Sequence, residues 1–415
     1  MRILILSFYF PPDLSAGSFR VKALVDALQA EGGKKLRIDV ITTLPNRYSS
    51  HTSSALEVEE VGCIRIRRLA LPSHQSGMVD QAKAFLSFAR QALAETRGQH
   101  SDLVLATSSR LMTAVLGARI ASRSRVPLYL DIRDLFTDTM SDLLAASFLR
   151  HLMPAFRWLE KQTFKAATRL NVVSAGFLQH AKEIAPAQSY RNFTNGIDEV
   201  FLSWDFKKPV QPVRELPLVV YAGNIGEGQG LHKVMPGVAR LMVGRAHFRL
   251  IGDGGRRSQL GQAISDAGLK NVEILNAMPR NELFEHYQQA DVLFLHLNDH
   301  MAFHKVLPSK LFEYAATGKP ILAGVAGYPA EFLQSEVDGV EVFAPCDALG
   351  MAEALERLLA HPKVARRAEF CGKYARETIM REMARDVLAI GTNTCVRRSS
   401  LLVLLVFWAA RFARV

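Results

Sequence analysis

A lysine and a glutamate three residues apart, Lys310 and Glu313, stand at the start of a predicted helix in the stretch VLPSKLFEYAATGKPIL. A proline and a serine precede the helix formers, and Gly318 and Pro320 predict its end. Residues at i and i+3 share a helix face, and a helix N-terminus attracts anions. This position therefore suits an anionic ligand beside Lys310; the alternative is a surface salt bridge between the two side chains.

Glycine-rich turns follow three of the predicted strands. They are PPDLSAGSFR with Gly17, YAGNIGEGQG with Gly223, Gly226, Gly228 and Gly230, and LIGDGGRRSQL with Gly252, Gly254 and Gly255 before Arg256 and Arg257. Glycine lets backbone N–H groups approach an anion, although any one of these turns is equally explained by a positive φ. Together they predict a phosphate-bearing ligand. None is a GxGxxG that opens a βαβ unit with an acid about twenty residues on, which disfavours a dinucleotide dehydrogenase.

Charged residues close another predicted strand in VPLYLDIRD. We expect Asp131, Arg133 and Asp134 to face a cleft and to act as catalytic groups, the alternative being an Arg–Asp pair that closes the strand structurally. A further polar group follows the strand ADVLFLHL. Its members, His296, Asp299, His300 and His304, have no settled zinc spacing, so we interpret them as lining a cleft.

The elements that must position these residues alternate between apolar strands and helices. This pattern is typical of a parallel α/β sheet covered on both faces. The stretch 203–217, rich in proline and mixed charge, interrupts the alternation, which then restarts. We therefore predict a first domain at 1–202, a linker at 203–217, a second domain at 218–375, a helix at 376–392 that returns to the first domain, and a tail at 393–415. Two Rossmann-like domains would face each other across a cleft.

Composition agrees with two globular domains. The chain has 415 residues, 49% hydrophobic and 22% charged, and a net charge of +11. A basic balance indicates an anionic partner or simply an arginine-rich surface. The scattered cysteines, Cys63, Cys346, Cys371 and Cys395, are interpreted as reduced thiols, and the apolar start Ile3–Phe10 as a strand rather than a signal peptide. A cytoplasmic protein is expected.

Six segments in order resemble the GT-B glycosyltransferases, in particular the retaining family 4 enzymes that build bacterial O-antigen and capsule. They are YFPPDLSAGSFRVKALVDAL, LDIRDLFTD, NFTNGID, YAGNIGEGQGL, LIGDGGRRSQL and LPSKLFEYAATGKPIL. The resemblance implies the GT-B fold, a nucleotide-sugar donor that is usually UDP-linked, and a lipid-linked saccharide acceptor on the N-terminal domain. It implies no metal and no cofactor, and the chain carries no DxD run at a strand end.

The resemblance also assigns roles to residues. Glu313 matches the second carboxylate of the family's EX7E pattern, which grips ribose hydroxyls, whereas Lys305 occupies the first position. The family's diphosphate-binding Arg and Lys fall near Asn224 and Gln229, so Lys310 with Arg256 or Arg257 become the replacement candidates. The expected donor-binding residues are Gly17, Asn224, Gly226, Gln229, Gly252, Gly254, Arg256, Lys310 and Glu313.

A basic amphipathic helix is predicted within residues 147–169. Arg157, Lys161 and Lys165 repeat at four-residue steps beside Trp158, which suits an anionic membrane surface; the helix would equally serve to cover the N-terminal sheet. The uncharged run 401–410 is too short to span a bilayer. We expect peripheral attachment to the inner face of the cell membrane.

Two other functions remain open. A UDP-sugar epimerase shares the GT-B fold and differs in interconverting sugars rather than transferring them. A basic nucleic-acid-binding module would need arginine or lysine patches interleaved with aromatic residues, whereas the arginines here are dispersed. No nucleic-acid partner is therefore expected.

Overall fold

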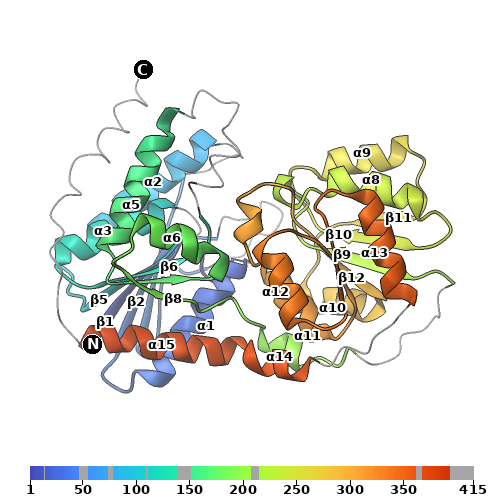
Figure 1. The fold of residues 1–415 in the computed structure, drawn as a ribbon. Helices are drawn as coiled ribbons and strands as arrows, with labels where there is room; N and C mark the ends of the chain where they lie inside the picture. Colours follow the sequence, from blue (N-terminus) through green and yellow to red (C-terminus); the bar gives the residue numbers. More distant parts are fainter. Residues whose placement is uncertain are drawn as a thin grey trace. The chain divides into compact units, whose positions relative to one another are not determined.

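The structure is a computed structural model that describes residues 1–13, 15–45, 55–72, 78–108, 111–135, 137, 151–206, 215–360 and 367–392. The chain forms two compact units (Figure 1). The first comprises residues 1–194 and takes up the chain again from residue 379, and the second comprises residues 195–378. The expected tail 393–415 lies outside the described residues.

The first unit is built on an eight-stranded sheet in the order β3-β4-β2-β1-β5-β6-β7-β8. Its strands are β1 Arg2–Leu6, β2 Arg37–Thr43, β3 Val58–Val61, β4 Ile64–Leu69, β5 Leu103–Ser108, β6 Leu128–Ile132, β7 Arg169–Val172 and β8 Ser189–Arg191. Its helices are α1 Ala16–Glu31, α2 Met78–Glu95, α3 Leu111–Ser124, α5 Met153–Ala166, α6 Leu178–Ile184 and α15 Arg376–Thr392, the last of which begins in the second unit, and a 3-10 turn, η2, spans Ala175–Phe177.

Pairing in this sheet is parallel except at the edge, where β3 returns antiparallel to β4. Every residue of β5 is buried, as expected for a strand covered on both faces. The helix α15 lies along α1 (Figure 1), where Arg385 donates to Glu31 at 2.9 Å. Met383 and Val387 of α15 are fully buried, so this helix contributes side chains to the hydrophobic core of the first unit.

The second unit contains a six-stranded, wholly parallel sheet in the order β11-β10-β9-β12-β13-β14. The strands are β9 Leu218–Ala222, β10 His247–Ile251, β11 Val272–Leu275, β12 Val292–His296, β13 Ile321–Gly324 and β14 Val340–Phe343. The helices are α7 Glu199–Ser203, α8 Leu231–Leu241, α9 Arg257–Asp266, α10 Arg280–Gln289, α11 Ser309–Thr317, α12 Tyr328–Glu336, α13 Ala348–Ala360 and α14 Ala368–Lys373, with 3-10 turns η3 Glu227–Gln229 and η4 Phe303–Lys305.

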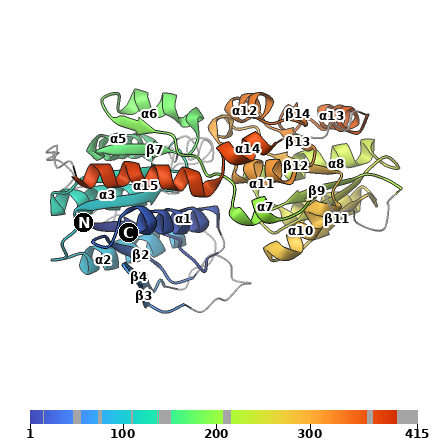
Figure 2. The same ribbon diagram turned by 90° about the horizontal axis from the view of Figure 1, so that it is seen from below.

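Alternate side chains of β9 build the two cores of this unit. Val219 and Tyr221 pack in one buried cluster with residues of α8 and α13. Val220 and Ala222 pack in the other, with residues of α10, α11 and α12. In that second layer α7, α11 and α14 lie side by side (Figure 2). The alternation follows from the two-residue period of a strand buried on both faces.

The expected architecture of two Rossmann-like parallel halves is confirmed. The helix α11 begins at Ser309 and ends before Gly318, which has φ of 72°, as the turn signals predict. The edge hairpin β3–β4 was not predicted, because its strands are short and rich in charge.

The expected linker 203–217 differs from the structure in its described part. Trp204 and Phe206 pack on Phe284 of α10, with ring centroids 5.1 and 5.7 Å apart, and Phe206 is buried. These aromatic side chains therefore tie the beginning of that stretch to the second unit, in which the chain already lies from residue 195. Residues 207–214 lie outside the described chain.

Candidate active site

Two glycine-rich loops at the carboxyl ends of β9 and β10 pack directly on each other. The Ile225 N–H donates to the Asp253 carbonyl at 2.8 Å, and the Arg256 N–H donates to the Ile225 carbonyl at 2.9 Å. Gly252 has φ of 149°, and a Cβ there would overlap the carbonyl group of Gly223. A side chain at position 252 would therefore separate the loops that form this end of the sheet.

The ammonium group of Lys310 reaches from the first turn of α11 to the loop after β9. Its Nζ donates to the Tyr221 hydroxyl at 3.1 Å and lies 4.2 Å from the centre of the Tyr221 ring. A Cβ at Gly223, where φ is 144°, would overlap Lys310 Nζ. Burial lowers the pKa of Lys310 to about 8, although Glu313 opposes this shift. A desolvated cation at a helix N-terminus is a suitable partner for a phosphate group.

The uncharged residues Asn224 and Gln229 are bonded to each other, Nδ2 to Oε1, at 2.7 Å. Gly226 packs closely against this pair, because a Cβ at this position would lie only 2.6 Å from Asn224 Nδ2. Gly254 meets the same loop, because its Cβ would lie 2.6 Å from the Ile225 carbonyl oxygen. The structure thus brings these four predicted residues together around one loop.

The two candidate arginines make ion pairs or hydrogen bonds of their own. Arg256 donates to Glu227 at 2.6 Å and to Gln259 at 2.9 Å, and Arg257 donates to Asn276 at 2.8 Å. An arginine paired with a carboxylate has part of its charge already compensated. The surroundings therefore favour Lys310 over Arg256 as the cation that a diphosphate would meet.

Glu313 lies one helical turn after Lys310 in α11, and its side chain lies beside Arg280 of α10. Its side chain is 16% exposed, and Oε1 lies 3.5 Å from the guanidinium of Arg280. Burial raises the pKa of Glu313, while Arg280 and then Arg376 oppose the shift. Lys310 contacts Tyr221 and Glu313 faces Arg280, so in the described residues the two side chains are not the surface salt bridge considered as the alternative.

In the first unit, Asp131 forms a buried ion pair with Arg20 of α1. Both side chains are 1% exposed, and two N–H···O bonds of 2.9 Å join them. Asn171 donates to the same carboxylate at 2.8 Å and Thr107 at 3.2 Å. Burial alone would raise the pKa of Asp131, but Arg20 and Asn171 lower it below its usual range. These contacts favour a structural role, which was the alternative for this residue.

Gly17 and Arg133 meet on the same unit. Gly17 is buried in the first turn of α1, after Ser15 has capped the helix by accepting from the Ser18 N–H at 3.0 Å. A Cβ at position 17 would overlap the Arg133 guanidinium. Asp134 is exposed beside it. Arg133 and Asp134, rather than Asp131, are therefore the catalytic candidates that remain near the surface.

The histidine group after β12 divides into separate contacts. His296 is buried, with Nδ1 2.6 Å from the Gln229 carbonyl and Nε2 accepting from the Cys346 N–H at 2.9 Å. Burial lowers its pKa to about 4, so it is neutral and braces the loop. His304 faces Asp299 at 3.0 Å. Within the described ranges no group of three or more metal-ligating side chains is present.

Sequence reasoning missed three residues that organise these sites: Tyr221, Arg280 and Arg20. Tyr221 is an ordinary aromatic residue of a buried strand in the sequence, and only the structure places its hydroxyl at Lys310. Arg280 and Arg20 pair with carboxylates 82 and 111 residues away. A weak signal existed for Arg20, which lies among the apolar residues on the buried face of α1.

The basic face of α5 is open to solvent. Arg157, Lys161 and Lys165 are exposed. Leu152, just before the helix, is 49% exposed and Trp158 is 39% exposed. Among the described helices, none has both the length and the apolar character needed to cross a bilayer.

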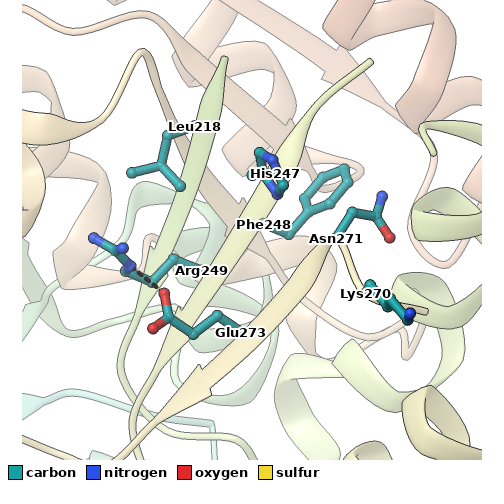
Figure 3. A pocket seen from close by; sticks show the side chains of 7 residues that line it. All are labelled: Leu218, His247, Phe248, Arg249, Lys270, Asn271 and Glu273. Carbon is teal, nitrogen blue, oxygen red and sulfur yellow. Dashed lines mark hydrogen bonds and ion pairs between the residues drawn. The ribbon is translucent and has the colours of Figure 1, made fainter. Parts of the chain in front are cut away.

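A separate hollow of about 270 Å³ lies at the amino ends of β9, β10 and β11 (Figure 3). Arg249 crosses it to Glu273 at 2.6 Å. The glycine loops lie at the opposite, carboxyl ends of these strands. Parallel α/β sheets do not usually bind ligands at the amino ends of their strands. The hollow is therefore not part of the candidate site.

Two family models match the chain in succession. The model "Glycosyl transferase 4-like domain" matches residues 17–196, and the model "Glycosyl transferases group 1" matches residues 203–378. A curated relative, the Escherichia coli (strain K12) protein WcaI, is described as a glycosyl transferase of colanic acid biosynthesis. It is 32% identical over 101 residues, which are 24% of this chain and 25% of the relative. The match thus spans about a quarter of the relative's length.

Solved structures are similar to the chain in fold. Sucrose-phosphate synthase from Thermosynechococcus elongatus gives a TM-score of 0.68 at 17% identity over 99% of both chains. Anabaena Alr3699/HepE in complex with UDP gives 0.61 at 16% identity over 94% of this chain and 98% of that chain. At such identities the likeness shows the fold alone.

Proposed function

The chain belongs to the GT-B glycosyltransferases, and we propose that it transfers a sugar from a UDP-linked donor to a lipid-linked saccharide in the synthesis of a cell-surface polysaccharide. The colanic acid relative supports the class of pathway, and the UDP complex of Alr3699/HepE supports the class of donor. The observation that carries the proposal is the position of Lys310, at the N-terminus of α11 and against the glycine loop after β9.

In this proposal the donor lies over the carboxyl ends of the second unit's strands. Lys310 contacts the diphosphate, and Glu313 accepts hydrogen bonds from both ribose hydroxyls one turn further along α11. Transfer with retention passes through an oxocarbenium-like state in which negative charge develops on the leaving β-phosphate. A cation placed there stabilises this charge more in the transition state than in the ground state.

The first unit would hold the acceptor. Arg133 and Asp134 are the side chains proposed to contact it, because they follow β6 near the protein surface. Asp131 would act indirectly, by fixing the end of β6 through Arg20 and Asn171. The exposed α5 face would bring the protein to the anionic membrane that carries a lipid-linked acceptor.

Titration calorimetry with UDP in the presence of EDTA tests the donor site. We expect binding without a metal ion. Glu313→Gln should weaken UDP roughly tenfold, since a hydrogen bond to a charged group contributes about 1.5–3 kcal/mol. Lys310→Ala should reduce turnover as well as affinity. Binding that disappears with EDTA and returns with magnesium or manganese would contradict the metal-free site.

Product analysis then tests the reaction. Incubation with UDP-sugars and a lipid-linked saccharide extract should yield free UDP and an extended saccharide. Conversion of one UDP-sugar to another, without release of UDP, would instead identify an epimerase.

A further inference from the structure

Arg280, the first residue of α10, lies between two carboxylates of the second unit. Its guanidinium donates to Asp198 Oδ2 at 2.8 Å and lies 3.5 Å from Glu313 Oε1. It also lies 5.7 Å from the centre of the Phe201 ring. The two carboxylates are 17% and 16% exposed and the Arg280 side chain is 34% exposed, so it is the carboxylates that are mostly shielded from water.

Asp198 is held from its other side by Arg376. Arg376 pairs with Asp198 and donates to the carbonyls of Asn195 at 2.8 Å and Gly196 at 3.2 Å. Its side chain is 4% exposed. Arg376, Asp198, Arg280 and Glu313 thus form a row of alternating charge in which Asp198 is fixed by two arginines. The same nitrogen of Arg280, Nη2, donates to Asp198 and lies 3.5 Å from Glu313 Oε1, so the contact with Asp198 also holds Arg280 beside Glu313.

A carboxylate that accepts two ribose hydroxyls must be ionised and must point at them. Arg280 lies 3.5 Å from Oε1 of Glu313, and its positive charge favours the rotation of the carboxylate that keeps this oxygen beside it. We propose that Arg280 is a positioning residue that orients the Glu313 carboxylate toward the ribose of the donor. This inference rests on the proposed role of Glu313 in holding the nucleotide.

The surroundings of Glu313 also give the expected effect of pH. Charged or titratable groups face it from four elements: Arg280 and Tyr287 of α10, Asp198 before α7, Arg376 of α15, and Lys310 and Tyr314 of α11 itself. Burial raises the pKa of Glu313, and Arg280 is the foremost group that opposes it. Without that cation the pKa rises further, so donor binding should be lost at a higher pH as the solution is acidified.

A purely structural role for Arg280 gives a different result. The bond to Asp198 and the contact with Phe201 both anchor α7, and their loss would lower thermal stability without changing which part of the nucleotide is recognised. A comparison of UDP with 2′-deoxy-UDP separates these roles, because the two ligands differ only in a ribose hydroxyl.

The test measures the affinities of both ligands by calorimetry between pH 5 and 8 for the parent chain, Arg280→Gln and Arg280→Lys. Arg280→Gln should bind UDP roughly five- to tenfold more weakly, reduce the preference for UDP over 2′-deoxy-UDP, and shift the acidic loss of binding to higher pH. Arg280→Lys, which keeps the charge, should restore part of the preference.

Arg249→Gln is the matched control. It removes another arginine–glutamate pair of the same unit, which lies at the amino ends of the strands (Figure 3). This variant should leave the preference for UDP over 2′-deoxy-UDP unchanged. A parent chain that binds both ligands equally would overturn the role of Glu313 and, with it, this inference. A parent that prefers UDP, with the same preference in Arg280→Gln and only a lower melting temperature, would overturn the inference alone.

Discussion

At the scale of single residues, Lys310 combines two properties that an anion site requires. It is a cation at a helix N-terminus, and partial burial of its side chain lowers its pKa. Tyr221 holds the ammonium group at the glycine loop through its hydroxyl and its ring. The position of the ammonium group is therefore fixed by these contacts. The burial that lowers its pKa also makes its protonation sensitive to pH near neutrality.

UDP binding should weaken above about pH 8. Burial lowers the pKa of Lys310 to about 8, so the ammonium form prevails below that pH and is lost as the pH rises through it. A site that needs the ammonium should bind UDP roughly fivefold more weakly at pH 9 than at pH 8. Calorimetry across pH 7–9.5 measures this. Lys310→Arg provides the control, since arginine remains protonated and its pH profile should be flat.

How far the sequence predicts this site depends on where each partner comes from. Lys310 and Glu313 are neighbours on one helix, so their spacing is visible in the sequence. Tyr221 and Arg280 meet them only after the strands and helices have packed, and no local pattern records such contacts. Asp131 shows the converse: its position at a strand end suggests catalysis, whereas its burial against Arg20 favours a structural role.

At the scale of elements, the loops after β9 and β10 depend on glycine for a steric reason. Gly252 has φ of 149°, and a Cβ there would overlap the backbone of Gly223, whose N–H donates to the Ile251 carbonyl. Gly255, three residues later, has open space where its Cβ would be. The two glycines of one turn should therefore respond differently to the same substitution.

We expect Gly252→Ala to lower the free energy of unfolding by roughly 1–3 kcal/mol, the usual range for a strained backbone, and to impair UDP binding. Gly255→Ala should remain within about 0.5 kcal/mol of the parent, as is usual for surface substitutions. Chemical denaturation and calorimetry measure both effects. Equal behaviour of the two variants would show that the loops tolerate displacement.

The exposed face of α5 leads to a prediction about membranes. Each basic residue near an anionic surface contributes roughly 1 kcal/mol, and Trp158 adds an aromatic side chain suited to the interface. Reversing the charges of Arg157 and Lys161 should therefore release the protein from anionic vesicles at low salt. Reversing Lys34 and Lys35, also exposed on the first unit, is the control and should have a smaller effect.

Co-sedimentation with neutral and anionic vesicles at low and high salt gives the readout. Equal partitioning to both kinds of vesicle would exclude electrostatic attachment. Binding that survives reversal at α5 but is lost when residues 399–415 are removed would assign attachment to that tail instead.

The strands and helices illustrate which elements the sequence can predict. Long apolar runs such as β5 and β9 are buried on both faces, and their pattern is unambiguous. The hairpin β3–β4 is rich in charged residues around Gly62, and only in β4 does isoleucine alternate with arginine. β4 also pairs in parallel with β2, and pairing between strands that are separate in the sequence is a long-range property.

At the scale of the whole molecule, the first unit is completed by a segment that is distant in sequence. Met380, Met383 and Val387 of α15 are fully buried, and Asp386 pairs with Arg169 and with Arg191, the latter at 3.0 Å. Local sequence patterns can predict this helix and its amphipathic character. The expected return of this helix to the first domain corresponds to the placement of its residues from Ile379 in the first unit.

A chain that ends at residue 375 should lose the stability of its first unit. Fully burying a methionine or valine side chain contributes about 1.5–3 kcal/mol, so three of them approach the whole stability of a typical domain. Calorimetric melting should show the first unit unfolded or melting far below the parent. A chain that ends at residue 392 keeps α15 and is the control; identical melting of the two truncated chains would contradict the prediction.

The two ends of the second unit are hydrogen-bonded to each other. The Ile197 N–H donates to the Tyr374 carbonyl at 2.7 Å, and the Arg376 N–H donates to the Ile197 carbonyl at 2.9 Å. In terms of the gene, residues 195–378 are a segment inserted within the first unit, and the two ends of this segment lie next to each other. Such a segment can be exchanged as a cassette for its counterpart from a relative, or closed by a short peptide and opened elsewhere as a circular permutant. The specificity for the donor could thereby be transplanted as one contiguous piece of the gene.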